Sequence, residues 1–370
     1  MKVAFVMPGV GVVGRGAEAF VVEIAGELAA RGFAVELFCR GEAPVPHRRV
    51  RALARDTRWL ARAYAANRLG RKALDTLFLD PMNVEWATAA LSAFPALWRG
   101  GYDVVVMEGG LVGAWLARLL RRLRGTAFVD VAHGADPKWE GAFARQRPDR
   151  VVAFTRAAAE SLGRLAPRAR VAVIPHGVDL DRFRPGEAPL PTGLPGPVVA
   201  VAGALDEHKR AELAVEAVAR LGDRGTAASL LVLGAGPRAG EVDRRAGERL
   251  GPGRYLRRTV PRAEMPAAYA AADLFTLPSR TESFGLGYLE AMACGLPCVA
   301  PDDSVRREVI GEAGLYCDVD DADAYAAALG DALGRDWAEI PRRRAEELPL
   351  ADTVDRWERL LRDLRGREAA

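Results

Sequence analysis

The chain has 370 residues, of which 50% are hydrophobic and 27% are charged, and its formal net charge is +3. This length suits two domains, each large enough for its own core. The composition is that of a globular protein, and no apolar run reaches the roughly 18–20 residues that a membrane-spanning helix needs. The apolar N-terminus is interrupted at Pro8 and Gly9, so we expect a first strand and helix there instead of a signal peptide.

The four cysteines show no metal-binding or redox spacing, which favours a reduced, cytoplasmic protein. Charge is divided unevenly along the chain. Residues 1–184 carry 28 Lys and Arg against 18 Asp and Glu, whereas residues 185–370 carry 24 against 31. The two halves therefore have net charges of +10 and −7, and we expect them to meet different partners.

The first half alternates strands with helices, which indicates a parallel sheet. A helix is expected over Ala17–Arg31, and strands over Val3–Met7, Ala34–Cys39, Tyr102–Met107, Ala127–Val131, Val151–Phe154 and Val171–Ile174. Gly9, Gly11 and Gly14 spell G-x-G-x-x-G, and Glu36 is expected at the end of the second strand, as in a dinucleotide-binding fold. An NAD-dependent oxidoreductase that uses this glycine loop is therefore an alternative function.

Two segments of the first half are basic. Residues 47–72 carry nine Lys or Arg with Leu53, Trp59, Leu60 and Tyr64 between them. The second segment is amphipathic and combines Arg118, Arg121, Arg122 and Arg124 with Leu116, Leu119, Leu120 and Leu123. Both segments suit a solvated helix face, and both suit attachment to an anionic membrane surface. Nucleic acid is not an expected partner, because the acidic second half offsets the field.

His133 directly follows an expected strand and precedes Gly134 and Asp136. Ligands bind at the carboxyl ends of strands in parallel sheets, so a ligand contact and a structural role are both open for this histidine. The stretch 184–197 is rich in proline and glycine and is expected to be a linker. This divides the chain into a first domain at 1–184, a second at 185–349 and a final helical segment at 350–370.

The second half restarts the alternation. Strands are expected over Val198–Ala202, Leu230–Leu233, Tyr255–Val260, Leu274–Leu277 and Cys298–Ala300, and helices over Met265–Ala271, Gly287–Cys294 and Leu350–Leu364. Within it, a glycine-containing loop at 283–287 lies between Glu282 and Glu290. Glycine allows close backbone approach, and the N–H groups that begin a helix favour an anion. Two carboxylates that accept from hydroxyls complete what a sugar diphosphate needs; solvated helix caps are the alternative.

Several ordered motifs of the second half carry a resemblance to a known family. They are the E-x7-E spacing of Glu282 and Glu290 within ESFGLGYLEAMACGLP, the segments 269–273 and 277–279, Val232–Pro237, and Ile174–Asp179, where His176 replaces the family's Asn. Together they resemble family 4 of the retaining glycosyltransferases. The resemblance is close over residues 170–315 and looser over the first domain, at Gly14–Glu18 and His133–Gly134. It implies an α/β GT-B fold: two Rossmann-like domains face each other across a cleft, and the C-terminal helix returns to the first domain.

The resemblance also implies roles for residues of the second domain. Glu290 is expected to bind the ribose hydroxyls of the donor, and Glu282 to face the donor sugar. The backbone at Phe284, Gly285 and Leu286 is expected to contact the sugar and the diphosphate.

Further roles concern the diphosphate and the base. Lys209, with Arg210, is expected to neutralise the diphosphate, since Ala204 stands where many relatives have an arginine. Backbone atoms near Val260 are expected to meet the base. From the first domain, Gly16 is expected to close over the phosphates and His133 to touch the donor sugar.

The resemblance further implies transfer of a hexose with retention of configuration, by front-face attack in which the leaving diphosphate takes the acceptor's proton. It implies no metal and no cofactor besides the nucleotide-sugar co-substrate, and cleft closure by a hinge near residues 184–197. The acidic run Asp318–Asp323 is interpreted as a loop and a helix start. The acceptor, a glycan, a lipid or a small molecule, stays open, and so does peripheral attachment to the inner face of a membrane.

Overall fold

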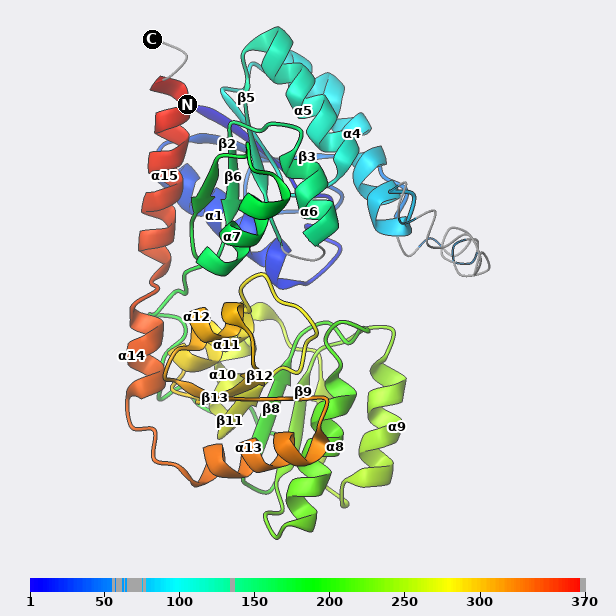
Figure 1. The fold of residues 1–370 in the computed structure, drawn as a ribbon, viewed down its shortest axis with the longest axis vertical. Coiled ribbons are helices and arrows are strands. Elements are labelled where there is room, and N and C mark those ends of the chain that lie inside the picture. Colours follow the sequence, from blue (N-terminus) through cyan, green and yellow to red (C-terminus); the bar gives the residue numbers. More distant parts are fainter. Residues whose placement is uncertain are drawn as a thin grey trace. The chain divides into compact units, whose positions relative to one another are not determined.

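The computed structural model of the protein describes residues 1–54, 57, 62, 64, 75, 78–133 and 137–366. The chain divides into two compact units (Figure 1). Unit 1 contains Met1–Ile174 and the chain from Val354 onward, and unit 2 is Pro175–Thr353. Much of the first basic segment, together with Gly134 and Asp136, lies outside the described residues.

The described part of unit 1 contains a seven-stranded parallel sheet with the order β3-β2-β1-β4-β5-β6-β7. Its strands are β1 (Lys2–Val6), β2 (Ala34–Cys39), β3 (His47–Arg49), β4 (Val104–Met107), β5 (Ala127–Val131), β6 (Arg150–Ala153) and β7 (Val171–Val173). Its described helices are α1 (Gly16–Ala30), α4 (Pro81–Arg99), α5 (Leu111–Arg124), α6 (Pro137–Ala144) and α7 (Arg156–Leu165). Successive side chains of a strand point to opposite faces, so each strand contributes to two cores.

One face of this sheet is covered by α4 and α5. Ala4, Val105 and Phe128 of three neighbouring strands form a buried cluster with Ala93 and Leu120 of the two helices. The sequence analysis gave no helix for α4, although its start is marked in the chain. Asp80 caps the helix by accepting from the backbone N–H groups of Met82 and Asn83, and Pro81 is the first helical residue.

The final helix, α15 (Leu350–Gly366), packs on the other face of the sheet of unit 1. Trp357 is completely buried, and its ring lies 6.1 Å from that of Phe5 on β1. Arg31, just after α1, donates to the carboxylates of Asp355 and Glu358. The prediction that the C-terminal helix returns to the first domain is therefore confirmed.

Unit 2 contains, in the described chain, a six-stranded parallel sheet with the order β10-β9-β8-β11-β12-β13. The strands are β8 (Val198–Ala202), β9 (Ser229–Leu233), β10 (Tyr255–Arg258), β11 (Leu274–Thr276), β12 (Cys298–Pro301) and β13 (Gly314–Cys317). The helices are α8 (Ala211–Asp223), α9 (Ala239–Arg249), the 3-10 helix η1 (Arg262–Glu264), α10 (Met265–Ala270), α11 (Leu286–Ala293), α12 (Ser304–Ile310), α13 (Ala322–Gly334) and α14 (Ile340–Glu346). Helices cover this sheet on both faces (Figure 1).

Each unit is thus a parallel α/β sheet of the Rossmann type, and this predicted fold class is confirmed. Besides the unpredicted helix α4, the structure differs from the sequence-based expectations at strand ends and at one edge strand. His47–Arg49, at the start of the first basic segment, forms the edge strand β3. Tyr255–Val260 is a strand only as far as Arg258, because the chain then turns at Pro261 into η1. Among the described residues, no helix is both long and apolar enough to cross a bilayer.

Candidate functional site

The loop before α11 lies at the carboxyl ends of the strands of unit 2, where parallel sheets bind ligands. Gly285 precedes the helix with φ of +89° and ψ of 60°, a left-handed conformation that favours glycine. A Cβ at this position would lie 2.7 Å from Cδ2 of Tyr288, which is fully buried. The N-cap residue Gly285 has no side chain to cap α11, so the N–H groups of the first turn suit an anionic ligand.

Lys209 and Glu282 meet beside this loop. The Lys209 Nζ donates to Glu282 Oε1 at 2.5 Å, and the two side chains are 26% and 10% exposed. Burial by itself raises the pKa of Glu282, but the ammonium of Lys209, the Ser279 hydroxyl and the charge of Arg306 outweigh it. The pKa of Glu282 is therefore below its ordinary value, and the carboxylate is ionised at neutral pH.

Backbone contacts hold the two segments that carry this ion pair. Asp206 Oδ1 accepts from the backbone N–H groups of His208 and Lys209, which forms a tight turn before α8. The N–H of Arg280 donates to the carbonyl of His208 at 2.7 Å. The loop after β8 and the loop after β11 are therefore joined directly, although they are far apart in sequence.

Arg306 holds the loop after β11 in place through hydrogen bonds to Ser279. Its side chain is 1% exposed, and its guanidinium donates to the carbonyl of Ser279 at 2.6 Å and to the hydroxyl of Ser279 at 2.7 Å. It also pairs with Asp303, the N-cap residue of α12. Because Ser279 in turn bonds to Glu282, the buried guanidinium fixes the carboxylate that meets Lys209. Arg306 was not predicted from the sequence, since it lies outside the recognised motifs.

Glu290 lies one turn into α11 and is 4% exposed. Arg262 Nη1 donates to its Oε1 at 2.5 Å, and the hydroxyl of Tyr269 donates to its Oε2 at 3.0 Å. Both oxygens of the buried carboxylate therefore accept hydrogen bonds, and the one from Arg262 is charge-assisted. Arg262 is a second residue that the sequence analysis missed, because its neighbour Val260 was singled out only for its backbone.

The remaining predicted residues of unit 2 are Arg210, Phe284 and Val260. Arg210 is adjacent to Lys209, but its Nε donates to the carbonyl of Pro278 and its Nη1 pairs with Asp320 at 2.5 Å. Its φ of +50° is uncommon for a residue other than glycine, and such backbone strain is often found at functional sites. Phe284 is buried edge-on against the ring of His176, with centroids 5.1 Å apart. Val260, half-buried, follows β10 and precedes η1.

His133 lies in unit 1, directly after β5. Its Nε2 bonds to Glu108 Oε2 at 2.8 Å, at the end of the neighbouring strand β4. Burial alone lowers the pKa of His133, but the hydrogen bond to Glu108 and the charges of Glu108, Glu140 and Glu18 more than compensate, so its pKa is raised. The imidazole is thereby oriented and held toward its protonated form.

Asp130 adds a buried carboxyl group near this histidine. It is 1% exposed, and neither carboxylate oxygen has a hydrogen-bond partner in the described part of the chain. Burial, together with the charges of Glu140 and Glu108, raises the pKa of Asp130 well above its ordinary value. The carboxyl edge of the sheet in unit 1 is consequently a site of several acidic groups around one histidine.

Gly16 is the first residue of α1, at the end of the glycine loop of unit 1. Gly11 in that loop has φ of +77°, and a Cβ there would lie 2.5 Å from the backbone N of Glu42. Glu36 lies in the middle of β2, where Arg48 and Tyr102 both donate to its carboxylate. This speaks against Glu36 as the ribose ligand of a dinucleotide, which has to lie at the end of the strand.

The acidic run of unit 2 forms a loop and a helix start, as predicted. Asp321 caps α13 by accepting from the N–H groups of Asp323 and Ala324. Asp320 pairs with Arg210, and Asp323 pairs with Arg220. Within the described ranges, no group of three His, Cys, Asp or Glu side chains is arranged to hold a metal ion.

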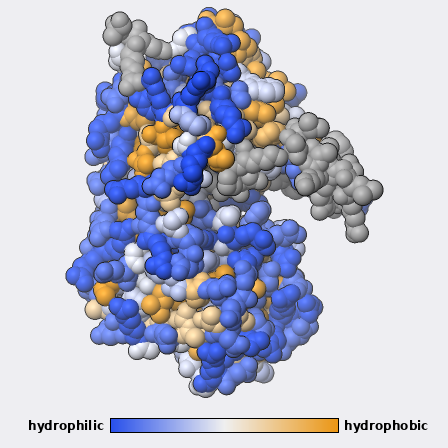
Figure 2. Space-filling view, viewed as in Figure 1, coloured by the Kyte–Doolittle hydropathy of each residue, from blue (hydrophilic) through white to orange (hydrophobic). Residues whose placement is uncertain are grey.

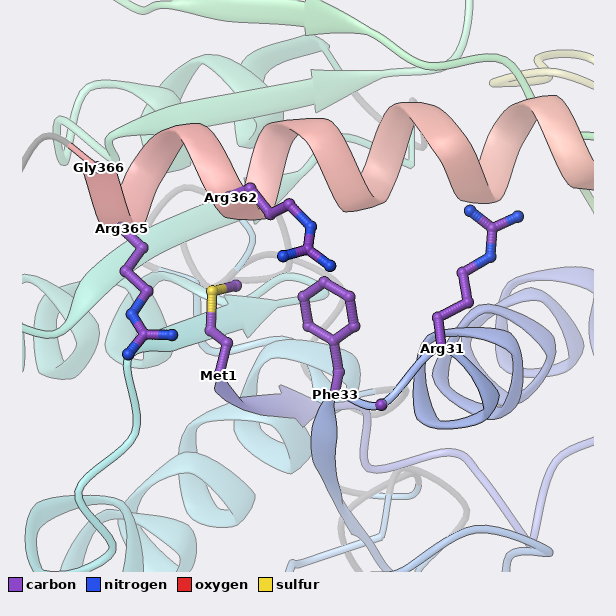
Figure 3. Close-up of a pocket in the computed structure, with 7 residues that line it drawn as sticks. Met1, Arg31, Phe33, Arg362, Arg365 and Gly366 are labelled. Atoms are coloured by element: carbon purple, nitrogen blue, oxygen red, sulfur yellow. The ribbon is translucent and has the colours of Figure 1, made fainter.

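A separate pocket of about 380 Å³ lies at the amino ends of strands in unit 1, near the starts of β1 and β2 (Figure 3). Figure 3 shows Arg362 of α15 extended toward the ring of Phe33, with Arg31 on the far side. Arg362 stacks 5.3 Å above that ring and also pairs with Glu358. These arginines therefore stabilise the packing of α15 against the rest of unit 1.

Known proteins resemble this chain over most of its length. Residues 14–182 match the family Glycosyltransferase Family 4, and residues 196–335 match the family Glycosyl transferases group 1. The GDP-mannose-dependent alpha-(1-6)-phosphatidylinositol monomannoside mannosyltransferase of Mycolicibacterium smegmatis is 31% identical over 308 residues, which cover 73% of this chain and 79% of the relative. The D-inositol 3-phosphate glycosyltransferase of the same organism is 30% identical over 403 residues, which cover 97% and 89%.

Solved structures agree on the fold. Sucrose-phosphate synthase from Thermosynechococcus elongatus superposes with a TM-score of 0.76 at 19% identity, over 99% of this chain and 100% of that one. Anabaena HepE, solved in complex with UDP and glucose, gives a TM-score of 0.72 at 15% identity, over 98% and 100%. The two parallel sheets, the returning helix α15 and these relatives lead to one conclusion: the chain is a glycosyltransferase of family 4 with the GT-B fold.

Proposed function

We propose that the protein is a retaining hexosyltransferase that transfers a sugar from a nucleotide-diphosphate donor to the hydroxyl of an acceptor. The observation that carries this proposal is the contact of Lys209 with Glu282 beside the N-terminus of α11. An ammonium with three N–H donors uses one for Glu282 and has others for the donor's diphosphate. This places a point charge and a helix N-terminus together where the leaving group gains negative charge.

In this proposal, Glu282 accepts from hydroxyls of the donor sugar, and the backbone from Phe284 to Leu286 contacts the sugar and the diphosphate. Glu290 accepts from the ribose hydroxyls on its solvent side, with Arg262 and Tyr269 keeping the carboxylate oriented. Backbone atoms near Val260 meet the base. Arg210 takes part indirectly, by tying the loop at Pro278 to Asp320.

Two residues of unit 1 complete the proposed machinery. Gly16 begins α1 without a side chain, so its backbone is able to approach the phosphates. His133, oriented by Glu108, contacts the donor sugar near the reacting carbon. The leaving diphosphate takes the proton of the attacking hydroxyl, so the protein needs no carboxylate pair for double displacement and no metal ion.

The acceptor is a glycan, a lipid or a small molecule. A relative's name specifies GDP-mannose as its donor, and HepE was solved with UDP. A mass-spectrometric screen of GDP, UDP and ADP sugars against pooled acceptors identifies donor and acceptor together. We place the reaction in the cytoplasm, as the compartment that supplies the nucleotide-sugar donor. If the protein were an NAD-dependent oxidoreductase, NAD would raise its melting temperature. The proposed transferase is expected to be stabilised by nucleotide sugars only.

The test uses the donor that the screen identifies. Lys209→Met is expected to lower kcat/KM by roughly a hundredfold to a thousandfold, because it removes charge stabilisation of the leaving group. Glu290→Gln is expected to weaken donor binding by about tenfold or more in calorimetry, with the fold intact. The matched control is Glu248→Gln, which breaks the exposed ion pair of Glu248 with Arg244 on α9. Normal turnover of Lys209→Met would refute the proposed site.

A further inference from the structure

Two neighbouring helices of unit 1 expose large apolar side chains. Among the described residues, seven large hydrophobic side chains are exposed, and four of them belong to α4 and α5. Leu91 of α4 is 56% exposed, and Trp115, Leu119 and Leu123 of α5 are 54%, 39% and 60% exposed. Figure 2 shows hydrophobic side chains gathered over these helices at the upper right. Such clustering marks an interaction surface, since exposed hydrophobics are otherwise scattered.

The helical spacing places these side chains in two stripes. Trp115, Leu119 and Leu123 are separated by four residues each and share one side of α5. Leu91 and Pro95 follow the same spacing on α4, and both are exposed. A groove of about 420 Å³ separates the stripes and is lined by Phe94, Pro95, Trp98, Arg99 and Leu119. We call this surface, with Arg118 and Arg122, the α4–α5 face.

The charges of the α4–α5 face are all positive. Arg118 and Arg122 lie three and seven residues after Trp115, so they alternate with its apolar stripe, and neither forms an ion pair within the described chain. Glu85 is the sole acidic residue of the two helices, and it is buried and paired with Arg40. Arg121 and Arg124 at the end of α5 are engaged instead with Asp149 and with the ring of Trp98.

We propose that the α4–α5 face docks on an anionic lipid bilayer. A bilayer offers an anionic surface above a hydrocarbon layer, which matches arginines that alternate with tryptophan and leucine. Tryptophan is favoured at the level of the headgroups, and guanidinium groups bind phosphate. A second copy of the chain is a poorer partner, because two such faces would bring unpaired arginines together. This attachment does not depend on which sugar the enzyme transfers.

The test measures binding of the full chain to vesicles of phosphatidylcholine alone or mixed with phosphatidylglycerol. Flotation with the anionic vesicles alone, weakened by added salt, is the expected result. Each arginine near an anionic surface contributes about fivefold to partitioning, so Arg118→Gln/Arg122→Gln is expected to lose roughly twenty-five-fold. Leu119→Ser/Leu123→Ser is expected to lose at least about tenfold, because less apolar surface is buried.

Matched controls change the same chemistry elsewhere on unit 1. Arg164→Gln/Arg168→Gln removes two exposed charges at and beyond the end of α7, and Val12→Ser/Leu79→Ser removes two exposed apolar side chains. Both controls are expected to bind vesicles like the parent chain. Brominated lipids are expected to quench the fluorescence of Trp115, and Trp115→Phe to lose that quenching. The proposal is overturned by absence of flotation, by equal losses in the controls, or by self-association that Leu119→Ser/Leu123→Ser abolishes.

Discussion

At the scale of single residues, burial separates the ion pairs that matter from those that do not. Lys209 and Glu282 are mostly buried, and the neighbouring Arg306 is almost completely buried. In contrast, Arg244 and Glu248 on α9 are each more than half exposed, and such surface pairs contribute only about 0–1 kcal/mol. Removing one partner of a buried pair costs more, because the other charge is left without compensation.

The pair of His133 and Glu108 predicts a pH dependence. The pKa of His133 is raised in the folded protein, so its contribution to stability is fully present below about pH 6.5, its ordinary pKa, and is lost as the pH rises through the folded value. Glu108→Gln is therefore expected to destabilise unit 1 by about 1–3 kcal/mol near pH 6 and by less at pH 9. Urea unfolding at a series of pH values checks this.

The control is a pair of the same two residue types in which the carboxylate is exposed. His47 Nε2 lies 2.9 Å from Glu42, whose side chain is 68% exposed. Glu42→Gln is expected to show no comparable change with pH, since water already solvates the exposed carboxylate of Glu42. A loss in Glu108→Gln that is equal at pH 6 and pH 9 contradicts the assigned role of His133.

At the scale of elements, the unit that matters is a strand, a loop and the start of a helix. The loop before α11 depends on Gly285, whose left-handed backbone and close neighbour Tyr288 leave no room for a side chain. Tyr288 cannot move aside, because its hydroxyl donates to the carbonyl of Leu277 at 2.6 Å. The position of the helix N-terminus is thus fixed by a buried aromatic side chain.

Gly285→Ala is expected to cost about 1–2 kcal/mol for the backbone conformation alone, and more for the clash. It is also expected to weaken binding of the donor's nucleoside diphosphate, because the N–H groups of the first turn shift. Unfolding and calorimetry check the two effects. Gly240→Ala in α9 is the control: its Cβ meets nothing within 4 Å, and a gain of about 0.5–1 kcal/mol is expected. Unchanged diphosphate affinity in Gly285→Ala would rule out the loop as the anion site.

At the scale of the whole molecule, α15 ties the end of the chain to the beginning. The helix starts in unit 2, where Thr353 donates to the carbonyl of Pro175, and from Val354 it belongs to unit 1. There Trp357 packs on Phe5, and Arg31 pairs with Asp355 and Glu358. Helix α15 therefore supplies part of the core that covers the sheet of unit 1.

Trp357→Ala is expected to destabilise unit 1 by about 3–5 kcal/mol, because a fully buried indole is removed. Hydrogen exchange is expected to accelerate in β1 and β2 and to stay nearly unchanged in β8 and β9. Trp337→Ala, a buried indole of unit 2, is expected to give the reverse pattern. If either variant accelerates exchange equally in both sheets, the units do not unfold separately.

The sequence by itself determined most of the strands, although β3 and the helix α4 were not predicted. Strands such as Ala34–Cys39, Ala127–Val131 and Val198–Ala202 were predicted at their observed bounds, because a buried strand is a short local run of apolar residues. Resemblance over a few ordered motifs indicated the family and the GT-B fold. Both kinds of signal are local in the chain.

The tertiary structure alone decided which side chains meet. Lys209 and Glu282 are 73 residues apart, Arg306 and Ser279 are 27 apart, and Arg262 and Glu290 are 28 apart. No local pattern encodes such pairs, because they arise when parallel strands bring the loops at their carboxyl ends to one edge of the sheet. For the same reason the buried partners Arg306 and Glu108 could not be found from sequence, whereas the residues they support, Glu282 and His133, could.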